Sequence, residues 1–193
     1  MKNIIPIIVM IISTVCFSQK KDILIKSDET NKIYLVQNKS SKLYDKLSNF
    51  SDFDVVFDEK DKTNGVNSKW LKVEKYKNNY VLYAPCDWIN ERKMIIENYH
   101  LKIKHGEIEK YNLIKHGNLG KNSFYAEYET DSVSKNKFSF IAKVIHEKPL
   151  VYEFEFSTNN SKWKENYSKV DHIKDFDIIY NECKAIKADE FEF

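Results

Sequence analysis

The chain has 193 residues, of which 42% are hydrophobic and 14% are aromatic. These fractions exclude a disordered chain, and the presence of only 4 Gly and 3 Pro excludes collagen-like and linker-dominated sequences. The 31 basic and 29 acidic residues leave a formal net charge of +2, which gives no sign of the basic surface that a nucleic-acid partner requires.

The N-terminal segment has the pattern of a secretory signal peptide. Lys2 supplies a positive charge, residues 4–17 form an apolar run, and the small Ser18 stands at the expected cleavage position. This run is shorter than the roughly 20 residues that a membrane-spanning helix needs. We therefore expect residues 1–18 to be removed and residues 19–193 to be exported, to the periplasm or outside the cell, with membrane contact only through the signal peptide.

A lipid anchor at Cys16 is the alternative for the same segment. Bacterial lipoproteins carry small residues directly before the modified cysteine, whereas the bulky Val15 precedes Cys16. Cleavage after Ser18 therefore remains the favoured prediction.

The residue usage indicates the source of the chain. Arg92 is the single arginine in a chain rich in Lys, Asn and Ile, which indicates an A+T-rich coding sequence and a bacterial source.

A short helix is expected after the Ser40-Ser41 pair, where a serine can act as the N-cap. The apolar residues that recur at helical spacing behind it are Leu43, Tyr44, Leu47 and Phe50.

From Lys69 to Ser157 the chain alternates apolar and polar residues in short runs separated by turn residues, which is typical of antiparallel strands. The clearest runs are 138–144 and 150–157, and Glu147-Lys148-Pro149 between them predicts a hairpin. Residues 80–84 are apolar throughout, as in a strand covered on both faces. The other predicted strands are 70–76, 94–97, 101–103, 108–114 and 124–129, with turns at 105–106 and 117–120.

The C-terminal part is expected to contain a second short helix and a last strand. Trp163, Tyr167 and Val170 recur at helical spacing after Asn160-Ser161, and residues 176–180 return to a strand pattern. No repeat or linker divides the chain. The sequence therefore predicts a single, mostly β domain: an antiparallel β-barrel or β-sandwich, built as a calyx-like meander, with one or two short helices.

Signal cleavage leaves two cysteines, Cys86 and Cys183, in an oxidising compartment. An even number of cysteines in an exported chain predicts a disulfide, with two buried free thiols as the alternative. Closing a loop of about a hundred residues would stabilise the fold by up to ~4.7 kcal/mol in the chain-entropy model.

The order of these elements resembles the calyx of the lipocalin family: an antiparallel meander, a helix near its end, a final strand, and a disulfide from the C-terminal region to the barrel. That family carries Gly-x-Trp near its first strand, and Ser68-Lys69-Trp70 stands there in this chain, with Ser in place of Gly. The resemblance is one of architecture, and it assigns no functional residue.

No catalytic residue, metal site or cofactor is predicted. His100, His105 and His116 border turns and match no metal-ligand spacing. The acidic residues between Asp171 and Glu192 lie in a stretch without the glycine that a calcium loop needs. Phosphate-binding glycine loops and Ser-centred nucleophile motifs are also missing from the sequence. A binding protein is favoured over an enzyme, although a dispersed catalytic site leaves no local pattern.

Aromatic residues gather on one face of the two clearest strands. If that face points into a barrel, it forms either a packed core or the wall of a cavity that holds a small apolar ligand. The candidate ligand-binding residues are Phe138, Phe140, Tyr152, Phe154 and Phe156.

The alternative function is a secreted protein that binds a protein partner, as inhibitors and immunity factors do, over a filled core. Its candidate interface residues are Trp70, Trp88 and Trp163, since exposed aromatic side chains dominate many interfaces. An open cavity lined by the aromatic face would favour the ligand; a filled interior with exposed tryptophans would favour the partner.

Overall fold

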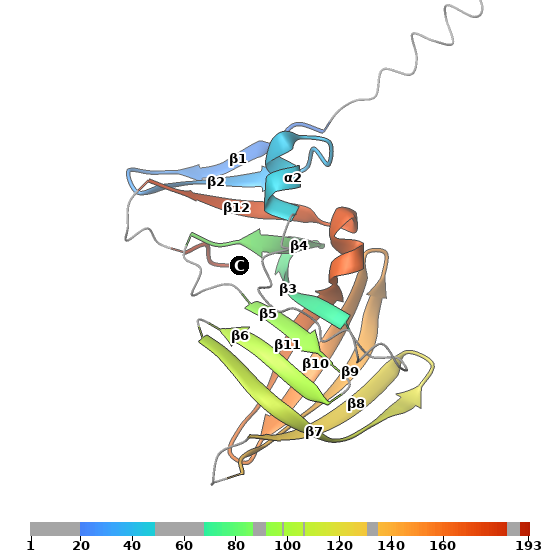
Figure 1. The fold of residues 1–193 in the computed structure, drawn as a ribbon. Coiled ribbons are helices and arrows are strands. Elements are labelled where there is room, and N and C mark those ends of the chain that lie inside the picture. Colours follow the sequence, from blue (N-terminus) through green and yellow to red (C-terminus); the bar gives the residue numbers. More distant parts are fainter. Residues whose placement is uncertain are drawn as a thin grey trace, which may run out of the picture.

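The computed structural model of the chain describes residues 20–48, 68–86, 92–97, 99–105, 107–130, 135–184 and 190–193. Within these residues twelve strands form one continuous sheet, part of which closes into a barrel (Figure 1). The predicted signal peptide, Cys16 and Trp88 lie outside the described residues.

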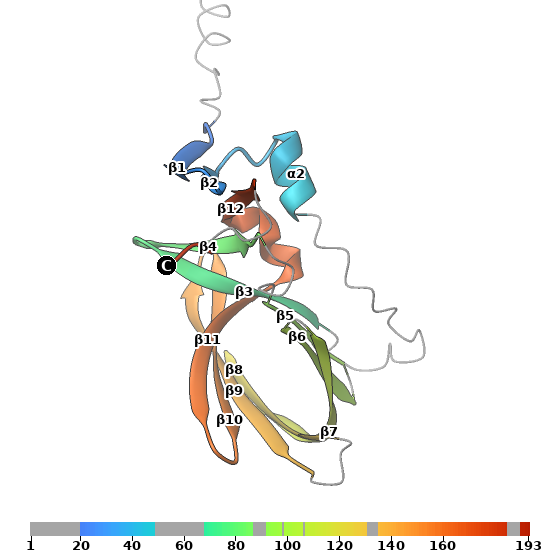
Figure 2. The same cartoon turned by 90° about the vertical axis from the view of Figure 1, so that its left-hand side faces the viewer.

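Eight strands make a closed antiparallel barrel, which confirms the predicted fold class (Figure 2). The barrel closes through its first strand, whose residues Ser68 to Leu71 pair with β5 while Trp70 to Val73 pair with β11 on the other side. The barrel strands are β3 (Ser68–Tyr76), β5 (Arg92–Ile96), β6 (His100–His105), β7 (Glu107–Gly120), β8 (Ser123–Thr130), β9 (Lys137–Glu147), β10 (Leu150–Thr158) and β11 (Lys162–Lys169).

The last residues of β3 leave the barrel and begin a second, open part of the sheet. They pair with β4 (Asn79–Ala84), which in turn lies parallel to β12 (Asp177–Cys183). Strand β12 also pairs with β2 (Asn31–Val36), and β1 (Ile23–Ser27) forms the edge. The sequence reasoning predicted β4 and β12 but not β1, β2 or the parallel pairing.

The first predicted helix is confirmed as α2 (Lys42–Ser48). Ser41 acts as its N-cap, because its Oγ accepts a hydrogen bond from the backbone N–H of Tyr44 at 3.0 Å. A helix of only 7 residues stays folded through packing rather than propensity, and Tyr44 supplies that packing as a fully buried side chain.

The second predicted helix is wrong in position. Residues 162–169 form β11, and a 3-10 helix, η3 (Val170–Asp175), follows it. Trp163 and Tyr167 are four residues apart, a spacing that places them on one face of a strand as well as of a helix. Both rings contact Phe156, at 5.3 and 6.1 Å between centroids, so packing inside the barrel decides in favour of the strand.

The turn predicted at residues 117–120 is also wrong, because β7 continues to Gly120 and the turn lies at residues 121–122. The ring of Tyr125 on the neighbouring strand lies across Gly117, and a Cβ at that position would come within 2.7 Å of it. Glycine at position 117 therefore fits close packing inside a strand rather than a turn, and any larger residue there would displace the Tyr125 ring.

Three apolar clusters stabilise the barrel and the open part of the sheet. The largest fills the barrel, the second lies between the open part of the sheet and α2 with η3, and the third covers the opposite face of that sheet. Strand β4 contributes Leu82 to the second cluster and Val81 to the third, both at most 2% exposed. The prediction that this strand is covered on both faces is confirmed.

The C-terminal residues 190–193 pack on the third cluster. Phe191 contacts the ring of Tyr76 at 5.8 Å, and Phe193 contacts Tyr83 at 5.2 Å. The Tyr83 hydroxyl donates to Glu190 and accepts from the backbone N–H of Phe191. Burial and the Glu190 carboxylate raise the pKa of Tyr83 to about 12, so this hydroxyl keeps its proton and holds the C-terminus on the sheet.

Tyr44 provides a test of the packing between α2 and η3. Its hydroxyl donates toward the carbonyl oxygens of Ile173 and Phe176, at 2.9 and 2.7 Å, and burial raises its pKa from 10.0 to about 12. The variant Tyr44→Phe removes the hydroxyl donor from the Phe176 carbonyl, while the Ile173 carbonyl keeps the hydrogen bond from the backbone N–H of Phe176 at 3.0 Å. We expect the free energy of unfolding at neutral pH to fall by about 1–3 kcal/mol.

The raised pKa of Tyr44 also determines how the free energy of unfolding changes with pH. Between pH 10 and about 12 the unfolded chain loses the Tyr44 proton while the folded chain keeps it, so the stability of the native chain falls as pH rises. The stability gap to Tyr44→Phe should therefore narrow between urea unfolding at pH 8 and at pH 11. A gap that stays constant would show that this hydroxyl is not the titrating group.

Candidate functional site

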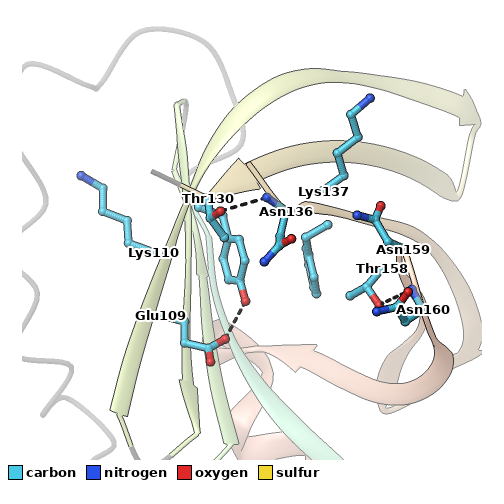
Figure 3. Close-up of a pocket in the computed structure, with 10 residues that line it drawn as sticks. Glu109, Lys110, Thr130, Asn136, Lys137, Thr158, Asn159 and Asn160 are labelled. Atoms are coloured by element: carbon cyan, nitrogen blue, oxygen red, sulfur yellow. Dashed lines mark hydrogen bonds between the residues drawn. The ribbon is translucent and has the colours of Figure 1, made fainter. Parts of the chain in front are cut away.

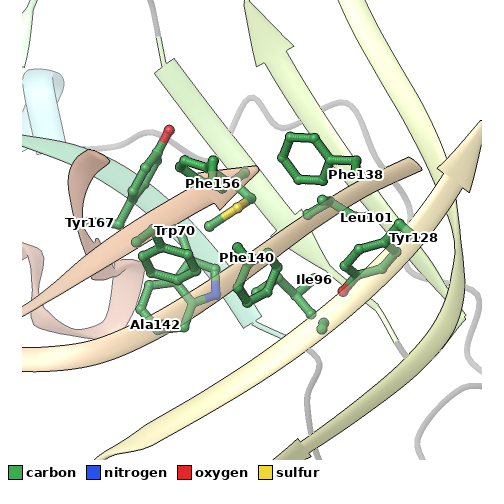
Figure 4. Close-up of a cluster of buried hydrophobic side chains, with 12 residues drawn as sticks. Trp70, Ile96, Leu101, Tyr128, Phe138, Phe140, Ala142, Phe156 and Tyr167 are labelled. Carbon is green, nitrogen blue, oxygen red and sulfur yellow. The ribbon is translucent and has the colours of Figure 1, made fainter. Parts of the chain in front are cut away.

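The middle of the barrel is filled by aromatic side chains (Figure 4). Phe140, Phe154 and Phe156 are 1%, 0% and 2% exposed, and their ring centroids lie 5.0 to 6.1 Å apart. Because a side chain that lines an empty space retains exposed surface, these values indicate a packed core at this level of the barrel. The central part of the interior therefore leaves no room for a ligand among these rings.

Four rings form a continuous row near the end of the barrel where β8 leads to β9 and β10 leads to β11. Tyr111 stacks on Phe138 at 4.9 Å, Phe138 lies 5.5 Å from Phe156, and Phe156 stacks on Trp163 at 5.3 Å. The rings come from β7, β9, β10 and β11, so every one of them points inward from a different strand. This row is the layer of the packed core nearest to that end of the barrel.

A cavity of about 550 Å³ lies at this end, and we call it the mouth cavity (Figure 3). Its apolar surface comes from Tyr111 and Phe138, and its polar surface comes from strand ends and from the turn between β10 and β11. The lining residues are Glu109, Lys110, Tyr111, Thr130, Asn136, Lys137, Phe138, Thr158, Asn159 and Asn160.

Hydrogen bonds fix the polar lining in place. The Tyr111 hydroxyl donates to the Glu109 carboxylate at 2.6 Å, and burial, together with this carboxylate, raises the pKa of Tyr111. The backbone N–H of Asn136 donates to Thr130 Oγ1 at 3.1 Å. Thr158 Oγ1 accepts in the same way from the backbone N–H of Asn160 at 3.4 Å. The site therefore rests on strands and an ordered turn.

The predicted ligand-binding residues lie together in the barrel cluster, but they have different roles. Phe138 is 4% exposed and belongs to the buried cluster, and it also borders the mouth cavity. Phe140, Phe154 and Phe156 are core residues away from the cavity, and Tyr152 is a partly buried residue that packs against them. The polar lining was not predicted. Asn160 was interpreted only as part of the Asn160-Ser161 start of a predicted helix, and Asn residues before such an element carry the same sequence signal whether or not they face a cavity.

The predicted interface tryptophans differ in exposure. Trp70 is 1% exposed inside the barrel, where it packs on Tyr152 and Phe154, so it belongs to the core and offers no surface to a partner. Trp163 is 38% exposed and ends the aromatic row.

The predicted disulfide is present in the structure. Cys86 and Cys183 are bonded, with Cα atoms 5.5 Å apart across a sequence separation of 97 residues. Cys86 follows β4 and Cys183 ends β12, so the bond joins two parallel neighbours at the same end. Cys86 is thus a structural residue.

Residues considered for metal binding are dispersed over the described part of the fold. His100 Nδ1 lies 2.9 Å from the Asn112 side-chain oxygen, and Asp177 pairs with Lys39 at 3.0 Å. Among the residues that the structure describes, no cluster of three His, Cys, Asp or Glu side chains could hold a metal ion.

A second cavity, of about 320 Å³, lies near the opposite end of the barrel. Its lining includes Tyr80, His146 and Asp177, and the first two rings contact each other at 5.2 Å. Asp177 is already occupied by Lys39 and by the side-chain amide of Gln37. The other acidic residue in its lining, Asp175, lies 3.2 Å from His172. This cavity is smaller and both of its acidic groups are engaged, so the mouth cavity is the better candidate site.

No helix among the described residues is long and apolar enough to cross a membrane. Searches of protein-family models, of curated proteins and of solved structures found no match to this chain.

Proposed function

We propose that this chain is an exported β-barrel binding protein that holds a small molecule in the mouth cavity. The observation that carries the proposal is a cavity of about 550 Å³ at the end of a closed barrel, with aromatic, amide, hydroxyl and carboxylate groups in its wall. Small-molecule sites typically occupy roughly 300–1,000 Å³, mix an apolar lining with a few polar groups, and occur at the mouths of β-barrels. The ligand would lie above Phe138 rather than deeper among Phe140 and Phe154.

Export is part of the proposal. The Cys86–Cys183 disulfide supports it, because such bonds persist in the periplasm and outside the cell and are rare in the reducing cytosol. The charged and apolar pattern of residues 1–18 supports it independently. Cleavage after Ser18 is the proposed maturation step, and lipidation of Cys16 is the alternative.

Native mass spectrometry of the protein recovered from its own compartment tests both parts. We expect a chain that begins at Gln19, together with the additional mass of one small molecule. The variant Asn159→Lys places a long cation in the wall of the mouth cavity and should lose that mass. Asn118→Lys makes the same change at an exposed position toward the far end of β7 and should keep it.

A recovered protein without any small molecule would contradict the proposed function. The mass of the full-length chain would contradict export through signal cleavage. The mass of a lipidated chain that begins at Cys16 would show that the protein is anchored by a lipid and is not cleaved after Ser18. A co-purifying protein in place of a small molecule would favour the interaction factor, for which the half-exposed Trp163 is the available anchor.

A further inference from the structure

The polar wall of the mouth cavity is built mainly from neutral groups. The amides of Asn136 and Asn159 line it, and each amide offers both hydrogen-bond donors and an acceptor. Figure 3 shows these two amides on the cavity side of the segments that carry them. Within the described residues, the hydrogen bonds of Asn136 are made by its backbone N–H and C=O, and the Asn159 side chain makes none, so both side-chain amides are available to a ligand.

The charged groups at the rim oppose a charged ligand of either sign. The Glu109 carboxylate, which accepts the Tyr111 hydroxyl at 2.6 Å, would repel an anion. Lys110 and Lys137 also belong to the lining, so the three charged groups together leave no excess of negative charge that would attract a cation. Figure 3 shows both lysine side chains extending away from the other lining groups, so neither is placed to bind a phosphate or carboxylate. A neutral ligand fits this arrangement best.

A purely apolar ligand does not fit the wall either. It would displace water from the amides of Asn136 and Asn159 without replacing the hydrogen bonds, which is unfavourable for each amide. The half-buried ring of Tyr111, beside the largely buried Phe138, nevertheless provides apolar surface. The matching molecule has an apolar face and a neutral edge of groups that both donate and accept.

We infer that the mouth cavity takes a neutral sugar, whose C–H face packs on the aromatic side of the wall while its hydroxyl groups bond the amides. This inference rests on the proposed function and names its ligand class. A hydroxyl donates one hydrogen bond and accepts others, as an amide does, so the two groups satisfy each other in either orientation. The cavity volume of about 550 Å³ is ample for a small sugar.

Titration of the 15N-labelled protein, followed by backbone amide resonances, tests the inference. The neutral sugar probes are D-glucose, N-acetyl-D-glucosamine and cellobiose; indole is the apolar probe and glucose 6-phosphate the anionic one. We expect at least one neutral sugar to shift the resonances of Tyr111, Asn136 and Asn159, with a Kd of about 1 mM. Indole and glucose 6-phosphate should bind about tenfold more weakly or not at all.

Two variants separate an amide role from a merely steric one. Asn136→Leu and Asn159→Leu keep the size of exposed side chains and remove the amides, and each should weaken sugar binding about tenfold. Asn118→Leu, at an exposed position on β7 outside the cavity lining, should leave it unchanged. The amide spectrum of each variant reports independently that the barrel remains folded.

The outcomes distinguish the ligand class from the proposed function. Indole binding at these residues without sugar binding, or sugar binding unaffected by both Leu variants, would overturn the sugar inference and leave a small-molecule site in place. Absence of a shift with all three sugars would also overturn it. The proposed function itself fails only if native mass spectrometry finds no bound molecule.

Discussion

Replacing Cys86 and Cys183 together by serine is expected to lower the free energy of unfolding by about 2–4 kcal/mol. The bond closes a loop of 97 residues that contains all eight barrel strands except the first, β3, and it fixes the end of β12 beside the end of β4. Without it the unfolded chain gains conformational freedom that folding must remove again. Chemical denaturation of the native and double-serine proteins under non-reducing conditions measures the difference.

Reduction of the native protein provides the matched control. In the presence of a thiol reductant the native chain should unfold at the same denaturant concentration as the double-serine variant. Equal midpoints for the oxidised native chain and the variant would show that the pair does not contribute, and rapid alkylation of Cys86 in the folded, unreduced protein would show that it is not bonded.

Phe154→Ala is expected to lower the free energy of unfolding by about 3–5 kcal/mol. Phe154 is 0% exposed and contacts Trp70, Phe140 and Tyr167 at 5.0 to 5.3 Å between ring centroids. These neighbours are held by different strands of a closed barrel, so they cannot move together to fill the space left by the ring. Urea unfolding followed by tryptophan fluorescence reports both the stability and the loss of packing around Trp70.

Phe193→Ala is the control for ring removal. That side chain is 47% exposed and packs on Tyr83 and Phe191 at the end of the described chain, so its loss should change stability by less than about 1 kcal/mol. If the two variants lost a comparable amount of unfolding free energy, the barrel interior would be loosely packed. An apolar ligand among the interior rings would then again be a candidate.

The barrel was predictable because its inward residues alternate within single strands. In β10 the residues Tyr152, Phe154 and Phe156 point inward while Glu153 and Glu155 point outward, and Glu153 pairs with Lys143 and Lys164 of both neighbouring strands. Every strand of a closed barrel has one face toward the interior and one toward solvent, so the alternation within single strands is enough to predict the fold class.

The open part of the sheet could not be predicted in the same way. Strand β12 lies between β2 and β4, and its pairing with β4 is parallel across almost a hundred residues of sequence. Local alternation indicates that a segment is a strand but does not identify its partners. Trp163 and Tyr167 illustrate a second limit, since a spacing of four residues satisfies both a helix and a strand.

The candidate site was predictable in part. The aromatic face was found from its two-residue period, but the number of rings that fill the interior depends on barrel closure, which no local pattern shows. The polar wall depends on how strand ends meet in space. Glu109, Asn136 and Asn159 come from three separate segments, and each has an ordinary turn or edge composition when it is considered alone.

The position of β12 also sets an order of assembly during synthesis. All eight barrel strands have been made once Lys169 is complete, whereas β12 begins at Asp177 and is the last of the described strands. Until then β2 and one side of β4 lack their common neighbour and present unpaired backbone edges, which are sites of aggregation. A prematurely terminated chain that ends before β12 thus contains every barrel strand but leaves β2 and β4 each with an unpaired edge, so the C-terminal segment protects the N-terminal hairpin by covering the edge of β2.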